Sequence, residues 1–149
     1  MNAGELCKRQ VVIAYRDTPL VEAAQLMREH HVGSLVVIVD RISERVPVGL
    51  ITDRDIVVAI VAKGLDERTL TAGEVMTREL VAVREEDGIS EVLRVMREKG
   101  VRRVVVLTRS GALAGIVAID DVLELVAEQM DAFVRTLHSE HVRETRVRH

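Results

Sequence analysis

The sequence predicts an α/β protein built from two tandem copies of a β-α-β-β-α unit, followed by a long C-terminal helix. The main support is an internal repeat, because Gly4–Arg9 recurs as Gly73–Arg78, a shift of 69 residues from residue 4 to residue 73. The shift persists further on, where Met27–Glu29 recurs as Met96–Glu98. In both copies short β-rich runs alternate with amphipathic helical segments. We expect two similar halves packed with pseudo-twofold symmetry, and clefts between such halves are common binding sites.

In the first copy, the β-rich run Val11–Ile13 precedes a helix for which Thr18 and Pro19 are the expected cap and first residue. Two strands, Leu35–Val39 and Val46–Ile51, then form a hairpin. A second helix is expected over residues 54–62, and its run Ile56–Val61 is apolar all round. Such a helix is buried on most sides, either in the core of the chain or at a dimer interface.

The second copy repeats this order with a shorter hairpin. Leu80–Val83 is its first strand, and a helix follows over residues 89–96. Val104–Leu107 and Leu113–Val117 form the hairpin, and the closing helix begins near Asp121. We therefore assign residues 1–64 to the first repeat, 65–72 to a linker, 73–130 to the second repeat and 131–149 to a helical extension.

The closing helix of the second copy has no stop signal, because neither Gly nor Pro occurs after Gly115. An apolar stripe at helical spacing continues past the repeat, and the stretch of residues 141–149 is expected to fray. Two interpretations stay open for the stripe. The helix folds back on the core of its own chain, or it binds a partner or a second copy. The stripe consists of Leu123, Val126, Met130, Phe133, Val134 and Leu137.

Composition restricts the class of protein. The chain has 149 residues, of which 48% are hydrophobic and 30% charged, so we expect one compact unit with a packed core. The net charge of −3 and the near absence of aromatic residues argue against a nucleic-acid partner, because such proteins usually carry positive charge and stack bases on aromatic side chains. No apolar run is long enough to span a bilayer and no secretion signal is recognised, so a cytoplasmic location without membrane attachment is expected.

The sharpest motif is Gly49-x-x-Thr52-x-x-Asp55, which lies where a strand opens into a helix, with the counterpart Gly115–Asp121 in the second copy. A Gly-x-x-Thr/Ser-x-x-Asp motif closing a β-α-β-β-α unit that is present twice resembles the CBS domain pair, or Bateman module. The resemblance covers residues 5–127. It implies that adenosine compounds bind in a cleft between the repeats, with the aspartate of the motif on the ribose and the threonine assisting.

Thr52 and Asp55 fit two roles. A strand end opening into a helix offers free backbone N–H groups, and a carboxylate can accept hydrogen bonds from both hydroxyls of a ribose. The residues alone favour a simpler interpretation, in which Thr-x-x-Asp is a capping box at the start of the helix. The two roles do not exclude each other, and the family resemblance shifts the weight for Asp55 toward ligand binding.

Cations for a phosphate follow the first helix of the second copy. In the CBS family, side chains at the junction between this helix and the next strand often contact the phosphates of the ligand, and Arg102 and Arg103 match those positions. The planar guanidinium group of arginine suits phosphate oxygens. The alternative is a pair of solvated surface arginines. Val105 stands where the family pattern often has proline, and Arg54 beside the motif is a further candidate phosphate contact.

The family arrangement implies two unequal clefts. One combines Thr52 and Asp55 with the arginine pair, and we expect one strong nucleotide site there. The adenine would lie against apolar residues around the first strand, which are equally ordinary core residues: Val12, Ile13, Ala14 and Val32. A weaker second site would combine Asp121 with Gly33 and Ser34, where Ala118 replaces the hydroxyl residue and the arginines are absent.

Other constellations carry less weight. The adjacent His30 and His31 point in different directions on a helix, so they rarely share a metal ion. His138 and His141 lie on one helix face, but the sequence shows no complete set of four ligands with them, so no metal site is expected. Cys7, the sole cysteine, occupies the position of Met76 and is interpreted as a small buried hydrophobe. No nucleophile with its base and no Gly-rich ATPase loop is visible, so the chain is not expected to be an enzyme.

The sequence therefore predicts a regulatory module that senses an adenine nucleotide, AMP, ADP or ATP, and acts on a separate regulated protein. NAD and S-adenosylmethionine share the adenosine and remain possible ligands, and no obligatory cofactor is expected. A homodimer is expected through the apolar helix faces. The alternative is a ligand-free structural module that mediates dimerisation or another protein–protein interaction.

Overall fold

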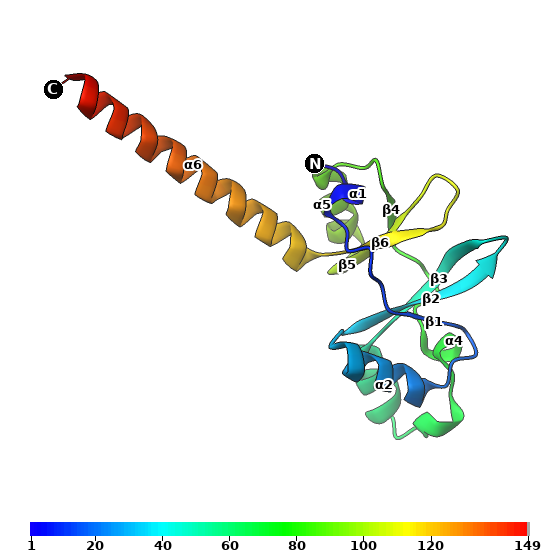
Figure 1. Cartoon of the computed structure of the whole chain (residues 1–149). Coiled ribbons are helices and arrows are strands. Elements are labelled where there is room, and N and C mark those ends of the chain that lie inside the picture. The colour runs from blue at the N-terminus through cyan, green and yellow to red at the C-terminus, as the bar shows by residue number, and fades with distance from the viewer. Residues whose placement is uncertain (149) are drawn as a thin grey trace. The chain divides into compact units, whose positions relative to one another are not determined.

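The computed structural model describes residues 1–148. Its internal contacts divide the chain into two units, Met1–Val117 and Ala118–His149. The first unit contains both repeats, each with a three-stranded sheet (Figure 1). The second unit is the helix α6 (Ile119–Arg148). The expected α/β fold with two tandem repeats and a long C-terminal helix is thus confirmed.

The first repeat forms a sheet in the order β1-β2-β3. β1 (Ile13–Ala14) runs parallel to β2 (Ser34–Arg41), and β2 pairs antiparallel with β3 (Glu44–Thr52). The predicted hairpin is correct, since Leu35 lies opposite Ile51 and Val39 opposite Val46. A bulge between Val37 and Ile38 shifts the register within it.

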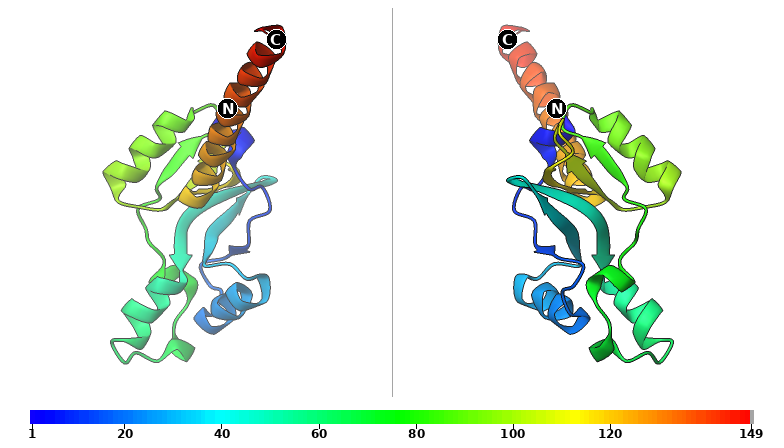
Figure 2. Two further views of the ribbon diagram at one scale, coloured as in Figure 1. Left: turned by 90° about the vertical axis from the view of Figure 1, so that its left-hand side faces the viewer. Right: turned by 90° about the vertical axis from the view of Figure 1, so that its right-hand side faces the viewer.

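The helices of the first repeat lie together on one face of this sheet. α2 (Leu20–His30) and the segment formed by α3 (Asp53–Asp55) and η1 (Ile56–Val61) lie side by side (Figure 2). They share a buried cluster with the β2 residues Leu35 and Val37. The sheet and its helices therefore enclose the core of the first repeat.

The second repeat uses the same plan. Its sheet has the order β4-β5-β6, with β4 (Ala82–Arg84) parallel to β5 (Arg103–Leu107) and β6 (Leu113–Ala118) next to β5. α5 (Ile89–Lys99) connects β4 to β5 and ends at Gly100, whose left-handed φ of 64° suits a residue without Cβ.

The opposite faces of the two sheets meet each other. Side chains alternate along a strand, so Leu35 and Val37 face the helices while Val36 and Ile38 face the other way. Val36 and Ile38 form a buried cluster with Val105 of β5, and apolar residues of both repeats surround it. This inter-repeat core holds the halves together in the first unit.

The segment that begins each repeat also forms backbone hydrogen bonds with the other repeat. α1 (Ala3–Leu6) bonds to the second repeat, where the Gly4 amide donates to the Glu85 carbonyl at 2.9 Å. α4 (Ala72–Val75) bonds to the first repeat, where the Gly73 amide donates to the Arg16 carbonyl at 2.9 Å. The 3₁₀ turn η2 (Glu67–Thr69) leads into α4. The exchange interlocks the two sequence repeats.

Several local expectations need correction. β1 and β4 begin two residues later than the β-rich runs beginning at residues 11 and 80, because only the last residues of each run pair with the next strand. Pro19, not Thr18, is the N-cap of α2, and the Thr18 hydroxyl instead accepts a hydrogen bond from the Tyr15 amide at 2.9 Å. The predicted helix over residues 54–62 is largely a π-helix, with the Ala62 amide bonded to the Val57 carbonyl five residues back.

α6 is one continuous helix of 30 residues. Residues 141–148, which were expected to fray, are part of α6, and His149 lies outside the described residues. Among the residues that the structure describes, no helix combines the length and the apolar character needed to cross a membrane.

Candidate functional site

The motif Thr52–Asp55 forms a complete capping box where β3 opens into α3. The Thr52 hydroxyl accepts a hydrogen bond from the Asp55 amide at 3.0 Å, and Asp55 Oδ2 accepts one from the Thr52 amide at 2.9 Å. The structural role that the residues alone favoured is therefore present. It holds the carboxylate of Asp55 in one orientation through its Oδ2 atom.

A cavity of about 330 Å³ opens beside this capping box. Its volume lies at the lower end of the range of about 300–1,000 Å³ that is usual for small-molecule sites. The two sequence repeats supply its walls together, joining the end of β3 and the start of α3 to the segments that flank β4 and β5. It is lined by Leu50, Thr52, Asp53, Arg54, Asp55, Thr77, Glu79, Leu80, Val81, Gly100, Val101, Arg102, Arg103 and Val105.

The arginine pair enters the cavity from the junction between α5 and β5. Because Gly100 ends α5 in a left-handed turn, the chain reverses and delivers Arg102 and Arg103 to the cavity wall. Arg103 is half-buried and Arg102 is exposed. Arg54 lies within the capping box and also lines the cavity, and its amide donates to Asp53 Oδ1 at 2.8 Å.

Gly33 is packed closely against this charged edge. A Cβ atom at Gly33 would lie 3.3 Å from Arg103 Nη2 and 3.3 Å from Asp53 Oδ2. The Asp53 amide also donates to the Gly33 carbonyl at 3.0 Å. A side chain at Gly33 would therefore push on Arg103 and Asp53 together, so the small residue keeps both groups in place.

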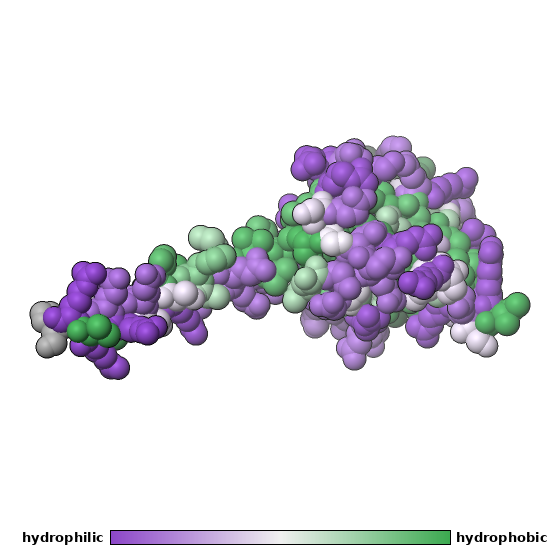
Figure 3. All heavy atoms as spheres, turned by 90° about the horizontal axis from the view of Figure 1, so that it is seen from above, coloured by the Kyte–Doolittle hydropathy of each residue, from purple (hydrophilic) through white to green (hydrophobic). Residues whose placement is uncertain are grey.

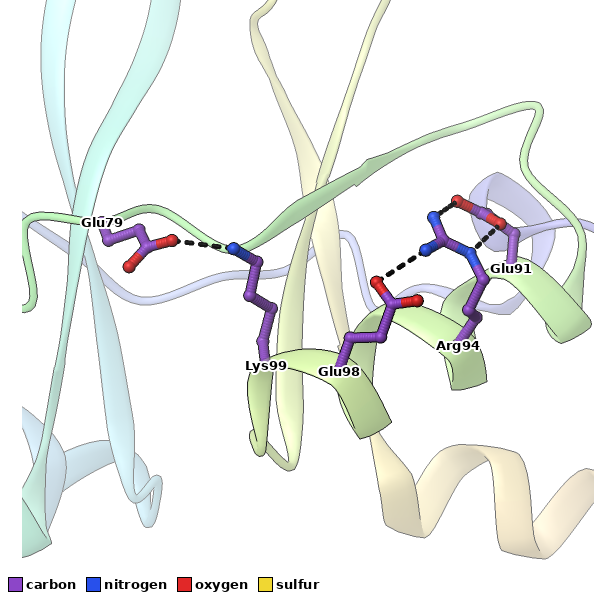
Figure 4. Close-up of polar contacts among 5 residues, drawn as sticks. All are labelled: Glu79, Glu91, Arg94, Glu98 and Lys99. Carbon is purple, nitrogen blue, oxygen red and sulfur yellow. Dashed lines mark hydrogen bonds and ion pairs between the residues drawn. The ribbon is translucent and has the colours of Figure 1, made fainter.

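Glu79 brings a further negative charge to the cavity, and Lys99 at the end of α5 compensates it (Figure 4). Lys99 Nζ donates to Glu79 Oε1 at 2.9 Å. This bond lowers the pKa of Glu79 and raises the pKa of Lys99. Both groups are solvent-exposed, so the ion pair contributes little stability. Lys99 therefore offsets the negative charge that Glu79 brings to the cavity, whose lining also holds three arginines.

Arg94, which precedes Lys99 on α5, bonds to two carboxylates of the same helix, Glu91 and Glu98 (Figure 4). These bonds raise the pKa of Arg94 and lower that of Glu91. None of these three residues lines the cavity. Glu98 is thereby engaged with Arg94, and Lys99 is directed to Glu79 (Figure 4).

Of the nine residues predicted for the stronger site, the cavity includes five and omits four. Thr52, Arg54, Asp55, Arg102 and Arg103 all line it. The apolar residues expected beside the adenine do not line this cavity, and their role stays a prediction. Ala14 is buried in the first-repeat cluster with Val12 and Val32 against it, and Ile13 packs on the inter-repeat cluster.

The apolar lining of the cavity includes Leu80, Val81 and Val101, which the sequence analysis did not select. The repeat itself contained the signal. Val81 is Val12 shifted by 69 residues, and Val101 is Val32 shifted by the same amount. A cleft that takes its arginines from the second repeat also takes its apolar wall from that repeat.

The weaker second site remains a prediction. Gly33 and Ser34 belong to the first unit and Asp121 to the second. Within the second unit, Asp121 Oδ2 accepts a hydrogen bond from the Ala118 amide at 2.9 Å, which matches the bond between Asp55 and Thr52. Ala118 has no hydroxyl, so the other half of a capping box cannot form.

Metal ligands do not gather in the part of the chain that the structure describes. Within residues 1–148, no group of three or more His, Cys, Asp or Glu side chains is arranged to hold a metal ion. Cys7 is buried, and its thiol donates to the Gly4 carbonyl at 3.4 Å. Burial raises the pKa of this thiol.

The repeated fold and the cleft with its Thr-x-x-Asp motif define a CBS domain pair. The CBS domain family model matches residues 3–62 and again residues 72–128, so the chain belongs to the CBS domain family. No match of that model extends beyond residue 128, which leaves most of α6 outside it.

Relatives support the assignment. Hypoxic response protein 1 of Mycobacterium tuberculosis is 41% identical over 128 residues, covering 86% of this chain and 82% of that protein. An uncharacterized protein of Methanopyrus kandleri is 31% identical over 144 residues, covering 92% of this chain and 72% of that protein.

Solved structures resemble the fold. The crystal structure of Hypoxic Response Protein I with two coordinated zinc ions has a TM-score of 0.71 at 37% identity, covering 83% of this chain and 98% of that chain. A CBS domain protein of Pyrobaculum aerophilum complexed with AMP has a TM-score of 0.74 at 28% identity, covering 85% of this chain and 99% of that chain.

Proposed function

We propose that this protein is a regulatory module that binds an adenosine nucleotide and transmits its occupancy to a separate partner protein. One observation carries the proposal. A single cavity combines the carboxylate of Asp55 and the hydroxyl of Thr52 from one repeat with Arg102 and Arg103 from the other. A carboxylate and a hydroxyl suit a ribose, and arginines suit a phosphate. Apolar residues of the same cavity offer a surface for a base.

The chemistry suggests how the ligand lies. The ribose hydroxyls donate to Asp55, whose second oxygen is available beside the one that caps Thr52. The phosphate lies toward Arg102 and Arg103, whose planar guanidinium groups suit its oxygens. The adenine lies against Leu80 and Val81, which contribute apolar area to the cavity.

The charges and volume of the cavity favour a nucleoside monophosphate over a triphosphate. Three arginines line it, but Asp53 and Asp55 offset part of their charge. A volume of about 330 Å³ also leaves limited room for further phosphates. The complex of the related Pyrobaculum protein with AMP is consistent with this choice. The proposal makes AMP the first ligand to test, with ADP, ATP, NAD and S-adenosylmethionine as competitors.

Regulation follows from the position of the cavity between two repeats. A ligand that contacts both repeats binds best to one arrangement of the two repeats, so ligand binding stabilises that arrangement. A partner protein that prefers this arrangement then binds the occupied and the empty module with different affinities. Nothing in the site supplies a nucleophile with its general base. We therefore assign the module a sensing role and no catalytic role.

Isothermal titration calorimetry with AMP, ADP, ATP, NAD and S-adenosylmethionine tests the proposal. The arginine variant is Arg103→Gln, with Arg97→Gln on the exposed side of α5 as the matched control. Loss of one charge-assisted bond to phosphate weakens binding by about 1.5–3 kcal/mol, roughly 10- to 100-fold. We expect that loss in Arg103→Gln only. Equal binding by wild type and Arg103→Gln, or two equal sites per chain, would contradict the proposed site.

The aspartate needs a conservative variant because Asp55 also caps the helix. Asp55→Ala would remove the cap, at about 1 kcal/mol, together with any ligand contact. Asp55→Asn keeps an oxygen that can accept from the Thr52 amide but removes the charge that holds two ribose hydroxyls. We expect Asp55→Asn to keep most of its thermal stability and to lose nucleotide affinity.

A ligand-free dimerisation module is the second candidate, and one surface favours it. In the first unit, Val57, Val58 and Val61 on η1 are 57%, 51% and 61% exposed, and Leu65 beside them is 49% exposed. Apolar residues gathered on one exposed face are typical of an interaction surface. The dimerisation module is supported over the nucleotide sensor if no adenosine compound binds and if Val58→Glu lowers the molecular mass of the protein in solution.

A further inference from the structure

Glu79 lines the cavity of the proposed nucleotide site, although its carboxylate repels the phosphate that this site is proposed to hold. Polar side chains cover much of the face of the first unit that Figure 3 shows, so an exposed glutamate elsewhere on this unit would be ordinary. At the cavity the same residue affects which anions can enter. The effect of Glu79 on ligand choice rests on the proposed function.

Glu79 lies on the side of the cavity from which the arginines enter. Its Oε1 atom accepts a hydrogen bond from Lys99 Nζ at 2.9 Å (Figure 4). Lys99 is the last residue of α5, and Gly100 then reverses the chain toward Arg102 and Arg103. Because Lys99 holds Glu79 at the junction that delivers the arginines, the carboxylate lies on the phosphate side of the cavity.

The backbone is fixed on both sides of Glu79. Two residues before it, the Thr77 amide donates to the Leu50 carbonyl at 2.9 Å. Two residues after it, the Val81 carbonyl accepts a hydrogen bond from the Val105 amide at 3.1 Å. Only the side chain of Glu79 can move appreciably, so a ligand meets its charge at the cavity wall.

The lining of the cavity carries as many negative charges as positive ones. Its arginines and carboxylates are Arg54, Arg102, Arg103, Asp53, Asp55 and Glu79. Lys99 lies outside the lining and offsets Glu79 only in part, because solvent screens an exposed ion pair. A second phosphate on the ligand therefore adds negative charge to a site with no surplus of positive charge in its lining.

We propose that Glu79 restricts this site to nucleoside monophosphates. A second phosphate extends from the first along the arginine side of the cavity, where the Glu79 carboxylate repels it. The bond from Lys99 to Glu79 also occupies an ammonium group that a second phosphate would otherwise bind. Placing a like charge against the unwanted ligand is a common means of discrimination.

Isothermal titration calorimetry of AMP and ADP at low ionic strength tests the role of Glu79. The variant is Glu79→Gln, and the matched control is Glu98→Gln, which removes the same charge from the neighbour of Lys99 outside the lining. We expect Glu79→Gln to raise the affinity for ADP relative to AMP by about 3- to 10-fold. Glu98→Gln changes this ratio by less than about twofold.

The outcomes separate this proposal from the proposed function. If wild type binds ADP as tightly as AMP, or if Glu79→Gln leaves the ratio of the two affinities unchanged, the restriction by Glu79 is overturned while the nucleotide site stands. If wild type binds neither nucleotide, the site itself fails and the restriction fails with it. Thermal unfolding controls for folding, because loss of an exposed ion pair leaves the Tm of Glu79→Gln within about 2 °C of wild type.

A double variant tests the part that Lys99 plays. In Glu79→Gln the released ammonium of Lys99 binds the second phosphate, whereas Glu79→Gln with Lys99→Gln removes both charges. We therefore expect the double variant to gain less ADP affinity than Glu79→Gln alone. An equal gain in the two proteins overturns the competition for Lys99.

Discussion

Replacement of Gly49 by alanine tests the interlocking of the two repeats. Gly49 is the first residue of the motif that ends at Asp55, and the segment that begins the second repeat crosses directly over it. A Cβ atom at Gly49 would lie 2.5 Å from Met76 Sδ and 2.8 Å from the Thr77 carbonyl oxygen. The thioether can move, but the carbonyl belongs to the backbone. The backbone of residues 76–77 must therefore shift.

The cost follows from what that shift breaks. The Thr77 amide donates to the Leu50 carbonyl at 2.9 Å, and this bond joins the two repeats beside the cavity. Forcing an extra methyl group into a packed site costs about 1–3 kcal/mol, and losing one backbone hydrogen bond adds about 1 kcal/mol. We expect Gly49→Ala to lower the free energy of unfolding by about 2–4 kcal/mol.

Thermal unfolding followed by circular dichroism measures this loss. For a unit of this size about 1 kcal/mol shifts Tm by roughly 4 °C, so the expected decrease is about 8–16 °C. Gly88→Ala is the matched control, because a Cβ there would meet no atom within 4 Å and its φ is −78°. A Tm for Gly49→Ala within about 2 °C of the control would refute the close approach of the two segments.

Three further predictions concern single sites. Gly88→Ser raises stability by about 0.5–1 kcal/mol in urea unfolding, because α5 begins at Gly88 without a side-chain cap and serine supplies one. In an NMR titration, Lys99→Gln raises the pKa of Glu79 to its ordinary value, because the ion pair that lowers it is removed. In wild type the small stabilisation from this ion pair is present above the ordinary pKa of Glu79, and it is lost as the pH falls through the lowered pKa. The Cys7 thiol reacts with a disulfide reagent at neutral pH only when the chain unfolds, because burial raises its pKa and blocks access. Rapid reaction of the folded protein would contradict this.

Much of the fold could be predicted from the sequence because the repeat supplied each element twice. The apolar run Leu35–Val39 predicts a strand that is buried on both faces, and Leu35–Ile38 are fully buried. Its predicted pairing with Val46–Ile51 is present in the structure. The exchange of leading segments could not be predicted. Gly49 and Gly115 meet Met76 and Cys7 across the repeats, and no local pattern in the sequence shows which strand a segment crosses.

Five polar residues that line the cavity were selected from the sequence, whereas its apolar residues Leu80, Val81 and Val101 were not. A motif fixes Thr52 and Asp55 relative to one helix start, and the junction before β5 fixes the arginines. Valines carry no comparable signature, since Val12 and Val81 are the same residue in equivalent positions of the two repeats. Only the geometry distinguishes Val81, which lines the cavity, from Val12, which packs into the core.

The capping box connects the local fold to the proposed chemistry. A free aspartate at a helix start samples several rotamers, and a ligand that needs one of them must pay for its ordering. In this protein two hydrogen bonds between side chains and backbone amides already hold Thr52 and Asp55 in position. Asp55 Oδ2 accepts from the Thr52 amide, so the carboxylate is ordered before any ligand arrives. If Asp55 binds the ribose as proposed, the two bonds that begin α3 lower the entropic cost of binding, and capping and ligand binding reinforce each other.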